Sequence, residues 1–474
     1  MSGRCARALV SLFACLALGT ACAPLPAWQA PPELGPDRPV VPPGSLTRFE
    51  LPNGLRVIVL EDLRLPRIAL SLELRRGAAV ESRAEAGLAD FTAELMERGA
   101  GKRNATAFAE AVDQLGATLA VASSFDSVRA SISGLASDED ALYALLADVV
   151  LRPRFDAVEA SKARREALAS LSRAVENPAT LRSWHMLRAL YGEHRYGLPE
   201  EGAAASVARF DAAAARRFHA KLFVPNNAVL SATGALRAED VRRRVEALFG
   251  GWKRGPVPDQ VPPPPARVPA ARRVVIVDRT ELGQAQIAVA HEGFARSDPR
   301  RIPANLLNDV IGGSGFSSRL MKRVRSDEGL TYGIWSGFST RRDSGGFSVA
   351  TFTRVEKTRE VIDLILSELV RARQEPPDAS ELDRARTQAA GGFATSLETS
   401  TLIASQLVNL DIHGLPEDSL ETYRSRVRAV TEAETAALAL ELLHPERSAI
   451  VVVGPAEELR PQLEGLGPIE IVKP

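Results

Sequence analysis

An internal repeat constrains the fold of this chain more than any other feature. A proline-rich segment at 255–270, with four consecutive prolines at 262–265, separates two stretches of similar length, 46–253 and 272–474. In each stretch, strand-like patterns come first, helical patterns follow, and a short apolar strand comes near the end. A repeat of this size indicates that one folding unit has been duplicated.

Similar phrases near the ends of the two stretches support the duplication. The phrase VPNNAVL at 224–230 leads to Gly234, and HPERSAI at 444–450 leads to Gly454. Each phrase places a proline before an apolar run that ends at a glycine, which is typical of a turn followed by a buried strand.

The expected elements run in the same order in both stretches. In the first stretch, strands are predicted at 56–60, 68–74, 118–122, 127–133 and 228–233, and helices at 87–98, 139–150, 156–175, 179–191, 211–222 and 238–249. In the second stretch, strands are predicted at 273–277, 284–290, 332–338, 346–352 and 448–453, and helices at 303–311, 317–325, 357–373, 379–394, 399–410, 432–443 and 455–463.

This order predicts an α+β fold with two homologous halves. Each half is expected to be an antiparallel sheet with helices packed on one face, and the halves are expected to face each other like a clam shell. The predicted divisions of the chain are a signal peptide at 1–21, a proline-rich tether at 22–45, an N-terminal half at 46–253, a proline-rich linker at 254–271 and a C-terminal half at 272–474.

The N-terminus is typical of a secretory signal. Arg4 and Arg7 precede a short apolar run that is too short to span a bilayer. Small residues then lead to Cys22, which resembles a bacterial lipoprotein signal, in which that cysteine is acylated. The alternative is a plain signal peptide with an incidental cysteine. We therefore expect a protein on the periplasmic side of the cell envelope, anchored to the membrane by a lipid on Cys22 and spaced from it by an extended tether.

Composition limits the function classes. The 474 residues include 59 Lys and Arg and 59 Asp and Glu, so the formal net charge is +0 and no nucleic-acid partner is expected. All three cysteines lie within the first 22 residues, so the rest of the chain can form neither an internal disulfide nor a thiolate metal site. No two of the 6 histidines are close enough to chelate from one helical turn. Packing or surface positions, rather than ligand roles, are expected of Trp184, His185 and His194.

Six short phrases occur in order along the body: LPNGLRV at 51–57, AGLADF at 86–91, LYGEHRYG at 190–197, FGGW at 249–252, IGGSGFSSRL at 311–320 and GLTY at 329–332. Together they resemble the insulinase-like zinc metallopeptidases, the family of pitrilysin and the mitochondrial processing peptidase. Each phrase is weak alone, but the set spans nearly the whole body and is specific.

The resemblance implies that the metal site of active members is absent here. Those members bind zinc through H-x-x-E-H on a helix, with the glutamate as general base, and through a further glutamate on a later helix. Asp90, Ala93 and Glu94 stand at the three motif positions, and Ala169 and Ser170 lie near the further ligand. Carboxylates are poorer zinc ligands than imidazole, and Ala93 cannot accept a proton. We expect no metal in this chain, and a solvated or ion-paired helix face at Asp90 and Glu94.

A second family feature is retained. In active two-half members, an arginine and a tyrosine seven residues apart reach from the second half towards the zinc site, and Arg325 and Tyr332 hold that spacing. Gly329 is a suitable C-terminal glycine for the helix carrying Arg325. A guanidinium and a phenol can stabilise the oxyanion of peptide hydrolysis, so these two are the candidate catalytic residues. The alternative is that Arg325 pairs with Asp327 or Glu328 and that Tyr332 packs at a strand edge.

The loop Gly312, Gly313, Ser314 and Gly315 is a candidate substrate-binding segment. It is not a P-loop, because no G-K-[ST] follows. The processing peptidase has a glycine-rich loop in the corresponding region of its non-zinc subunit, which the resemblance links to substrate handling. The alternative is a tight connection that needs positive φ angles.

Two functions remain open. The first is the non-zinc-binding subunit of a heterodimeric zinc metallopeptidase, in which a homologous partner holds the zinc and this chain contributes Arg325, Tyr332 and part of the chamber wall. Its substrate would be a peptide or an unfolded polypeptide. The second is a catalytically inactive scaffold or peptide-binding protein at the cell envelope, in which Arg325 and Tyr332 are relics.

Overall fold

The computed structural model describes residues 39–260 and 271–474. The predicted signal peptide, Cys22, most of the tether and residues 261–270 of the linker lie outside the described residues, so the statements about them stay predictions. Within the described ranges, no helix combines the length and the apolar character that a membrane span requires.

The first half builds a six-stranded sheet in the order β1-β2-β8-β3-β7-β6. Buried and partly exposed residues alternate along β3, as in a strand whose two faces have different surroundings. The strands are β1 (Leu46–Glu50), β2 (Arg56–Glu61), β3 (Arg67–Leu74), β6 (Thr118–Ser123), β7 (Val128–Leu135) and β8 (Ala228–Gly234).

The second half builds a sheet of the same design, in the order β14-β9-β13-β10-β12-β11. From the second strand onward the two orders correspond strand by strand, which confirms the two homologous α+β halves. The strands are β9 (Arg273–Asp278), β10 (Gln284–Glu292), β11 (Ile334–Thr340), β12 (Gly345–Arg354), β13 (Ala449–Gly454) and β14 (Ile469–Val472).

The expectation of wholly antiparallel sheets was wrong in one respect. β8 runs parallel to β2, and β13 and β14 run parallel to β9. β8 and β13 each enter their sheet after a long helical stretch, and a connection of that length can return a strand in the parallel direction. The remaining pairs are antiparallel.

Helices cover one face of each sheet and form its main hydrophobic core with it. The α-helices of the first half are α2 (Leu88–Met96), α3 (Ala105–Asp113), α4 (Glu139–Leu151), α5 (Ala157–Glu176), α6 (Pro178–Tyr191), α7 (Ala204–Val207), α8 (Ala212–Leu222) and α9 (Ala238–Phe249). Those of the second half are α10 (Arg301–Asn308), α11 (Thr358–Gln374), α12 (Ala379–Thr395), α13 (Ser400–His413), α14 (Ser419–Ala429), α15 (Glu432–Leu442) and α16 (Ala456–Leu463). Among them, α6 and α13 pack on the sheet of the other half.

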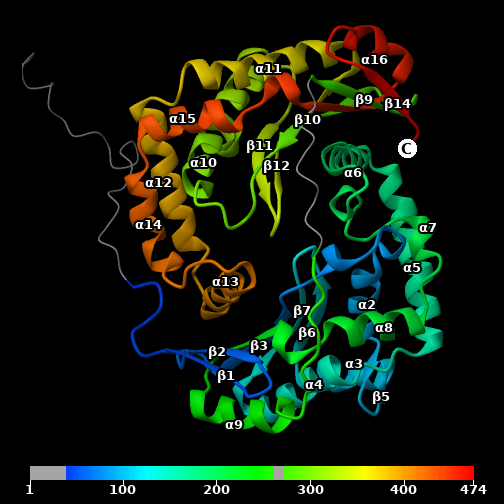
Figure 1. The fold of residues 1–474 in the computed structure, drawn as a ribbon, viewed down its shortest axis with the longest axis vertical. Helices are drawn as coiled ribbons and strands as arrows, with labels where there is room; N and C mark the ends of the chain where they lie inside the picture. Colours follow the sequence, from blue (N-terminus) through cyan, green and yellow to red (C-terminus); the bar gives the residue numbers. More distant parts are fainter. Residues whose placement is uncertain (1–38, 261–270) are drawn as a thin grey trace, which may run out of the picture. The chain divides into compact units, whose positions relative to one another are not determined.

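The opposite face of each sheet is covered by a helix from the other half. α6 packs on β9, β10 and β13, where Leu181 meets Val275 and Val451 in an apolar cluster. α13 packs on β2, β3 and β8, where Leu407 meets Leu60. Figure 1 shows α6 beside the second sheet and α13 beside the first. We call α6 and α13 the exchanged helices, because each packs apolar residues on the sheet of the other half.

Candidate functional site

The site is built around α2, whose beginning is held by a buried ion pair. Gly87, at φ +94°, turns the chain into the helix, and a Cβ there would lie 2.3 Å from the carbonyl oxygen of Glu201. The Glu81 carboxylate accepts hydrogen bonds from the backbone N–H groups of Gly87 (3.0 Å) and Ala89 (2.5 Å) and from Arg195 Nε (2.7 Å). An acid at this position satisfies helix donors that have no partner within the helix.

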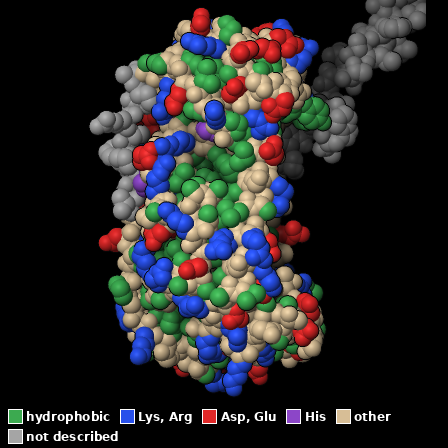
Figure 2. Space-filling model, turned by 90° about the vertical axis from the view of Figure 1, so that its right-hand side faces the viewer, with side chains coloured by type: hydrophobic (Ala, Val, Ile, Leu, Met, Phe, Trp, Pro, Cys, Tyr) green, Lys and Arg blue, Asp and Glu red, His purple; other side chains and the backbone are tan. Residues whose placement is uncertain are grey.

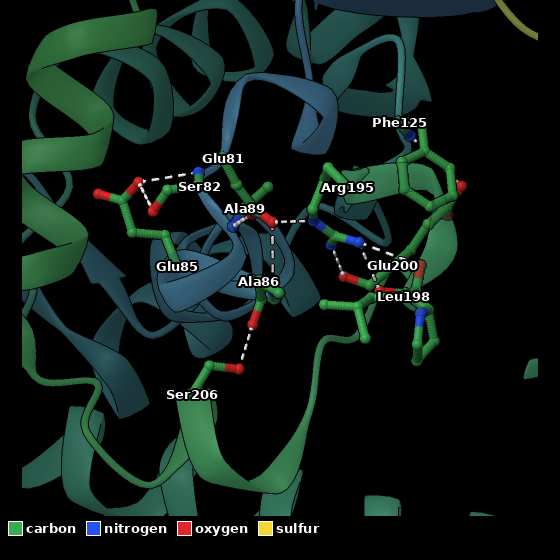
Figure 3. Close-up of polar contacts among 12 residues, drawn as sticks. Glu81, Ser82, Glu85, Ala86, Ala89, Phe125, Arg195, Leu198, Glu200 and Ser206 are labelled. Carbon is green, nitrogen blue, oxygen red and sulfur yellow. Dashed lines mark hydrogen bonds and ion pairs between the residues drawn. The ribbon is translucent and has the colours of Figure 1, made fainter. Parts of the chain in front are cut away.

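Arg195 also holds the loop at 198–200 near the start of α2. Its other guanidinium nitrogens donate to the carbonyl oxygens of Leu198, Pro199 and Glu200, as Figure 3 shows for the contacts around Glu81 and Arg195. Both side chains of the pair are almost completely buried, at 0% and 3% exposure. Burial raises the pKa of Glu81 to about 7, while Arg195 and the two backbone donors act in the opposite direction. The pair therefore holds the loop after Arg195 against the start of α2.

A cavity of about 470 Å³ lies where these segments meet α5 and α6. We call it the acidic cavity, because four carboxylates line it. Asp90 and Glu94 come from α2, and Ser170 comes from α5, so the structure brings together three positions that the sequence marked separately. Ala93 is 1% exposed and packs in the core. The lining residues are Asp90, Glu94, Glu166, Ala167, Ser170, Leu171, Arg173, Ala174, Thr180, Trp184 and Glu201.

The two carboxylates of α2 have different environments. Burial, together with the negative charges of Glu201 and Glu94, raises the pKa of Asp90 to about 6. Glu94 instead forms an ion pair with Arg98, which also pairs with Glu166. The expected ion-paired helix face is therefore present at Glu94. Asp90 is more buried than expected and has no ion pair among the described residues.

The residues at the acidic cavity do not fit a zinc ion. Zinc sites in proteins use mainly imidazole nitrogen and thiolate sulfur as ligands, and carboxylates are the minority. A catalytic zinc site needs three protein ligands. Here the donors would be Asp90, Glu94 and the Ser170 hydroxyl, and Glu94 is already bound to Arg98. Throughout 39–260 and 271–474, no group of three or more His, Cys, Asp and Glu side chains is arranged to hold a metal.

Arg325 and Tyr332 lie in the second half, on the segment that leads into β11. Arg325 sits in a π-helical turn, Met321–Asp327, which ends at Gly329 with φ +64°. Its guanidinium carbon lies 4.6 Å from the centre of the Tyr332 ring, and Tyr332 is 75% exposed. The alternative of an ion pair with Asp327 or Glu328 is not observed: within the described part of the chain, the Arg325 side chain has no ion pair or hydrogen bond.

The glycine-rich loop is a compact turn against β11. A Cβ on Gly312 would lie 2.4 Å from Ser336 Oγ, so the close approach of the two segments requires glycine there. Gly315 has φ +61°, which also favours glycine. The Ser314 hydroxyl donates to the Asp309 carbonyl oxygen at 2.6 Å. The loop's part in substrate binding stays a prediction.

A second cavity, of about 520 Å³, adjoins the acidic cavity, because both are lined by Leu171 and Trp184. We call it the apolar groove. Leu168, Val175 and Leu181 line it as well, together with Pro474 at the C-terminus. Figure 2 faces this side of the molecule and shows apolar side chains gathered in a hollow.

Trp184 and His185 on α6, and His194 after it, all contact other parts of the site. Trp184 and His185 both line the apolar groove, and burial lowers the pKa of His185. His194 accepts a hydrogen bond at Nδ1 from the backbone N–H of Tyr196 at 3.1 Å. His194 therefore has a structural role in the turn that carries Arg195.

Three residues of the site had no clear signal in the sequence. Glu166 lies one turn before Ser170 on α5, and helical spacing could have placed it in the cavity. Glu201 lies in a loop that carries no periodicity. The Phe316 ring centre lies 4.5 Å from the Arg325 guanidinium carbon, and only the fold brings the two together.

Two family descriptions match consecutive parts of the chain. Residues 56–203 match the Insulinase (Peptidase family M16) domain, and residues 209–389 match the Peptidase M16 inactive domain. An uncharacterized zinc protease of Streptomyces coelicolor is 26% identical over 420 residues, which are 88% of this chain and 91% of that protein. An uncharacterized zinc protease of Mycobacterium bovis is 27% identical over 409 residues, 86% of this chain and 93% of that protein.

Solved structures share the fold. The peptidase M16 inactive domain from Pseudomonas fluorescens superposes with a TM-score of 0.81 at 26% identity, covering 86% of this chain and 98% of that one. A protease from Helicobacter pylori superposes with a TM-score of 0.79 at 18% identity, covering 86% of this chain and 99% of that one, and shows the fold alone.

Proposed function

The chain belongs to the insulinase-like M16 peptidase family, and we propose that it is the non-zinc-binding subunit of a heterodimeric zinc metallopeptidase. A homologous partner that carries H-x-x-E-H would hold the zinc, which polarises the scissile carbonyl and activates water when bound. This chain would contribute Arg325, Tyr332 and a surface for the polypeptide.

The observation that carries the proposal is the contrast between two parts of one chain. On α2, Ala93 offers no base and Glu94 forms an ion pair with Arg98. In the second half, by contrast, the Arg325 and Tyr332 side chains have no polar partner within the described ranges, and Tyr332 is largely exposed. A guanidinium and a phenol that are free to donate can stabilise negative charge on a carbonyl oxygen held at another subunit's metal.

The apolar groove supports a polypeptide substrate. It is lined mainly by aliphatic and aromatic side chains and lies next to the acidic cavity through Leu171 and Trp184. A mostly apolar surface next to a polar cavity suits a peptide segment with apolar side chains better than a small charged molecule. We further propose that the two subunits work on the periplasmic side of the envelope and that this chain is anchored through Cys22.

The test compares the chain alone with the chain bound to its zinc-bearing homologue. Alone it should cleave neither a quenched fluorescent peptide nor unfolded casein, and together the two chains should cleave in a metal-dependent way. Arg325→Ala/Tyr332→Phe should lower turnover by about 10²-fold or more without changing assembly, because two oxyanion donors are lost.

Arg354→Ala is the matched control, because Arg354 is an exposed arginine at the end of β12. Turnover equal to that of the control would rule out a catalytic role for the Arg325 and Tyr332 pair. A chain that binds peptides but stimulates no homologue would instead favour the scaffold or peptide-binding alternative.

A further inference from the structure

Two exposed aromatic rings lie against the guanidinium of Arg325. Its guanidinium carbon lies 4.5 Å from the centre of the Phe316 ring and 4.6 Å from that of the Tyr332 ring. Phe316 is 70% exposed and Tyr332 is 75% exposed. Large aromatic side chains usually bury most of their surface, so two exposed rings at one cation are an unusual arrangement. We call Phe316, Arg325 and Tyr332 the Arg325 clamp.

The local backbone sets the Phe316 ring in place. Gly315, at φ +61°, turns the chain out of the glycine-rich loop, and Phe316 follows in the short helical turn Gly315–Ser317. The Ser318 hydroxyl closes this turn by donating to the Gly315 carbonyl oxygen at 2.8 Å. The three members of the clamp therefore come from three successive segments, each fixed by its own turn.

The ring contacts leave the guanidinium N–H groups available. Both rings attract the cation, and neither ring face supplies an oxygen acceptor to these groups. Across 39–260 and 271–474, no acidic side chain or carbonyl oxygen accepts from them. The clamp therefore presents a fixed row of donors to a planar oxygen acceptor from outside the chain.

We propose that Phe316 is a positioning residue that orients Arg325 for a peptide carbonyl or carboxylate oxygen. The identity of the ligand rests on the proposed function, because a peptide being hydrolysed supplies that oxygen. The arrangement of the Arg325 clamp does not depend on a partner chain. Without the Phe316 ring, Arg325 loses one of its two cation–π contacts and can swing into solvent on its flexible stem.

The first test measures the clamp in the full chain alone. Phenylglyoxal condenses with guanidinium nitrogens, so rings that pack against the group slow the reaction. The rate at Arg325 is followed by peptide mass mapping and divided by the rate at Arg354. Phe316→Ala should raise this ratio about threefold, as the loss of one exposed cation–π contact implies, and Phe316→Tyr should leave it unchanged. An unchanged ratio in Phe316→Ala overturns the inference.

The second test separates positioning from folding in the active pair. Phe316→Ala should lower kcat about tenfold and leave KM within about twofold, and Phe316→Tyr should restore kcat, because only orientation of a reacting group is lost. An active pair in which Phe316→Ala keeps its kcat contradicts the inference. A wild-type pair without activity contradicts the proposed function, while the modification ratio still decides whether the clamp exists.

Discussion

Asp90 has a strongly raised pKa at the acidic cavity. Burial and the nearby Glu201 and Glu94 raise its pKa to about 6 from an ordinary value of 3.8. Between these two values the folded chain keeps a proton that the unfolded chain has lost. The contribution of Asp90 to stability therefore falls as the pH rises from about 4 to about 6 and stays low above that range.

Asp90→Asn should remove this loss. The amide has the same shape but no charge, so we expect the variant to be more stable than wild type by about 2 kcal/mol at pH 7.5 and equally stable near pH 4. Urea unfolding at the two pH values measures the difference. Asp113→Asn, at an exposed position on α3, is the control and should follow wild type. A variant that follows wild type at both pH values would contradict the buried environment of Asp90.

The pair of Glu81 and Arg195 should matter far more than an exposed ion pair. Arg195→Leu leaves the buried Glu81 carboxylate without its cation, so the free energy of unfolding should fall by about 3 kcal/mol or more. Lys357→Ala breaks the exposed pair of Lys357 with Glu360 and should cost about 0.5 kcal/mol or less. Denaturant titrations of the two variants provide the comparison, and equal losses would count against the proposed importance of the pair.

The environment of Asp90 could be predicted from the sequence only in part. The family resemblance placed Asp90, Ala93 and Glu94 at the positions of H-x-x-E-H, and their identities predicted that the histidines are missing. The raised pKa of Asp90 also depends on the charge of Glu201, which is more than 100 residues away in the chain. The ion pair of Arg195 with Glu81 holds the loop of Glu201 near Asp90. No local sequence pattern predicts such a long-range contact.

At the element scale, hydrophobic periodicity predicted most of the strands and helices. The strand predicted at 228–233 is β8, and the helix predicted at 379–394 is α12. The helix predicted at 317–325 is instead a π-helical turn at Met321–Asp327, because hydrogen-bond pattern is not encoded in apolar spacing. The helix α14 was missed, since its charged and polar sequence buries only Leu420 and Val427.

The hairpin between β11 and β12 links the two halves through Arg341 and Arg342. At its tip, Arg341 lies over the rings of Phe125 (4.1 Å), Tyr196 (4.6 Å) and Tyr191 (5.2 Å). The backbone N–H of Arg342 donates to Asp126 Oδ2 at 2.9 Å. The tip therefore docks beside the turn that carries Arg195.

Arg341→Ala should lower the free energy of unfolding by about 1 to 3 kcal/mol, because three cation–π contacts and the packing of the side chain are lost together. Arg341→Lys should fall between alanine and wild type, since it keeps the charge but not the planar face. Equilibrium denaturation measures both. If Arg341→Ala were as stable as Arg354→Ala, the hairpin tip would not be a significant contact between the halves.

At the scale of the whole molecule, the two exchanged helices determine how the halves are joined. The sequence predicted two similar halves, but it could not show that α6 and α13 each cover the sheet of the other half. The sequence of each of these helices predicts an apolar face. Hydrophobic periodicity does not identify the surface that this face packs against. The partner of each face is set only when both halves are folded together.

This arrangement predicts that the halves stay together after the chain is cut. A protease site placed within 261–270 should give two fragments that co-elute in gel filtration at native pH and separate only in denaturant. Exchanged apolar contacts hold the fragments, and no covalent link is needed. Fragments that separate without denaturant would contradict the exchange.

The central claim is that this chain works beside a zinc-bearing homologue without holding zinc itself. Co-purification of the two chains, followed by metal analysis of the pair and of each chain, tests it most directly. The account predicts one zinc per pair, none in this chain alone, and loss of the zinc when the partner's H-x-x-E-H histidines are replaced. Zinc that remains with this chain alone, together with metal-dependent peptide cleavage by it, would contradict the account.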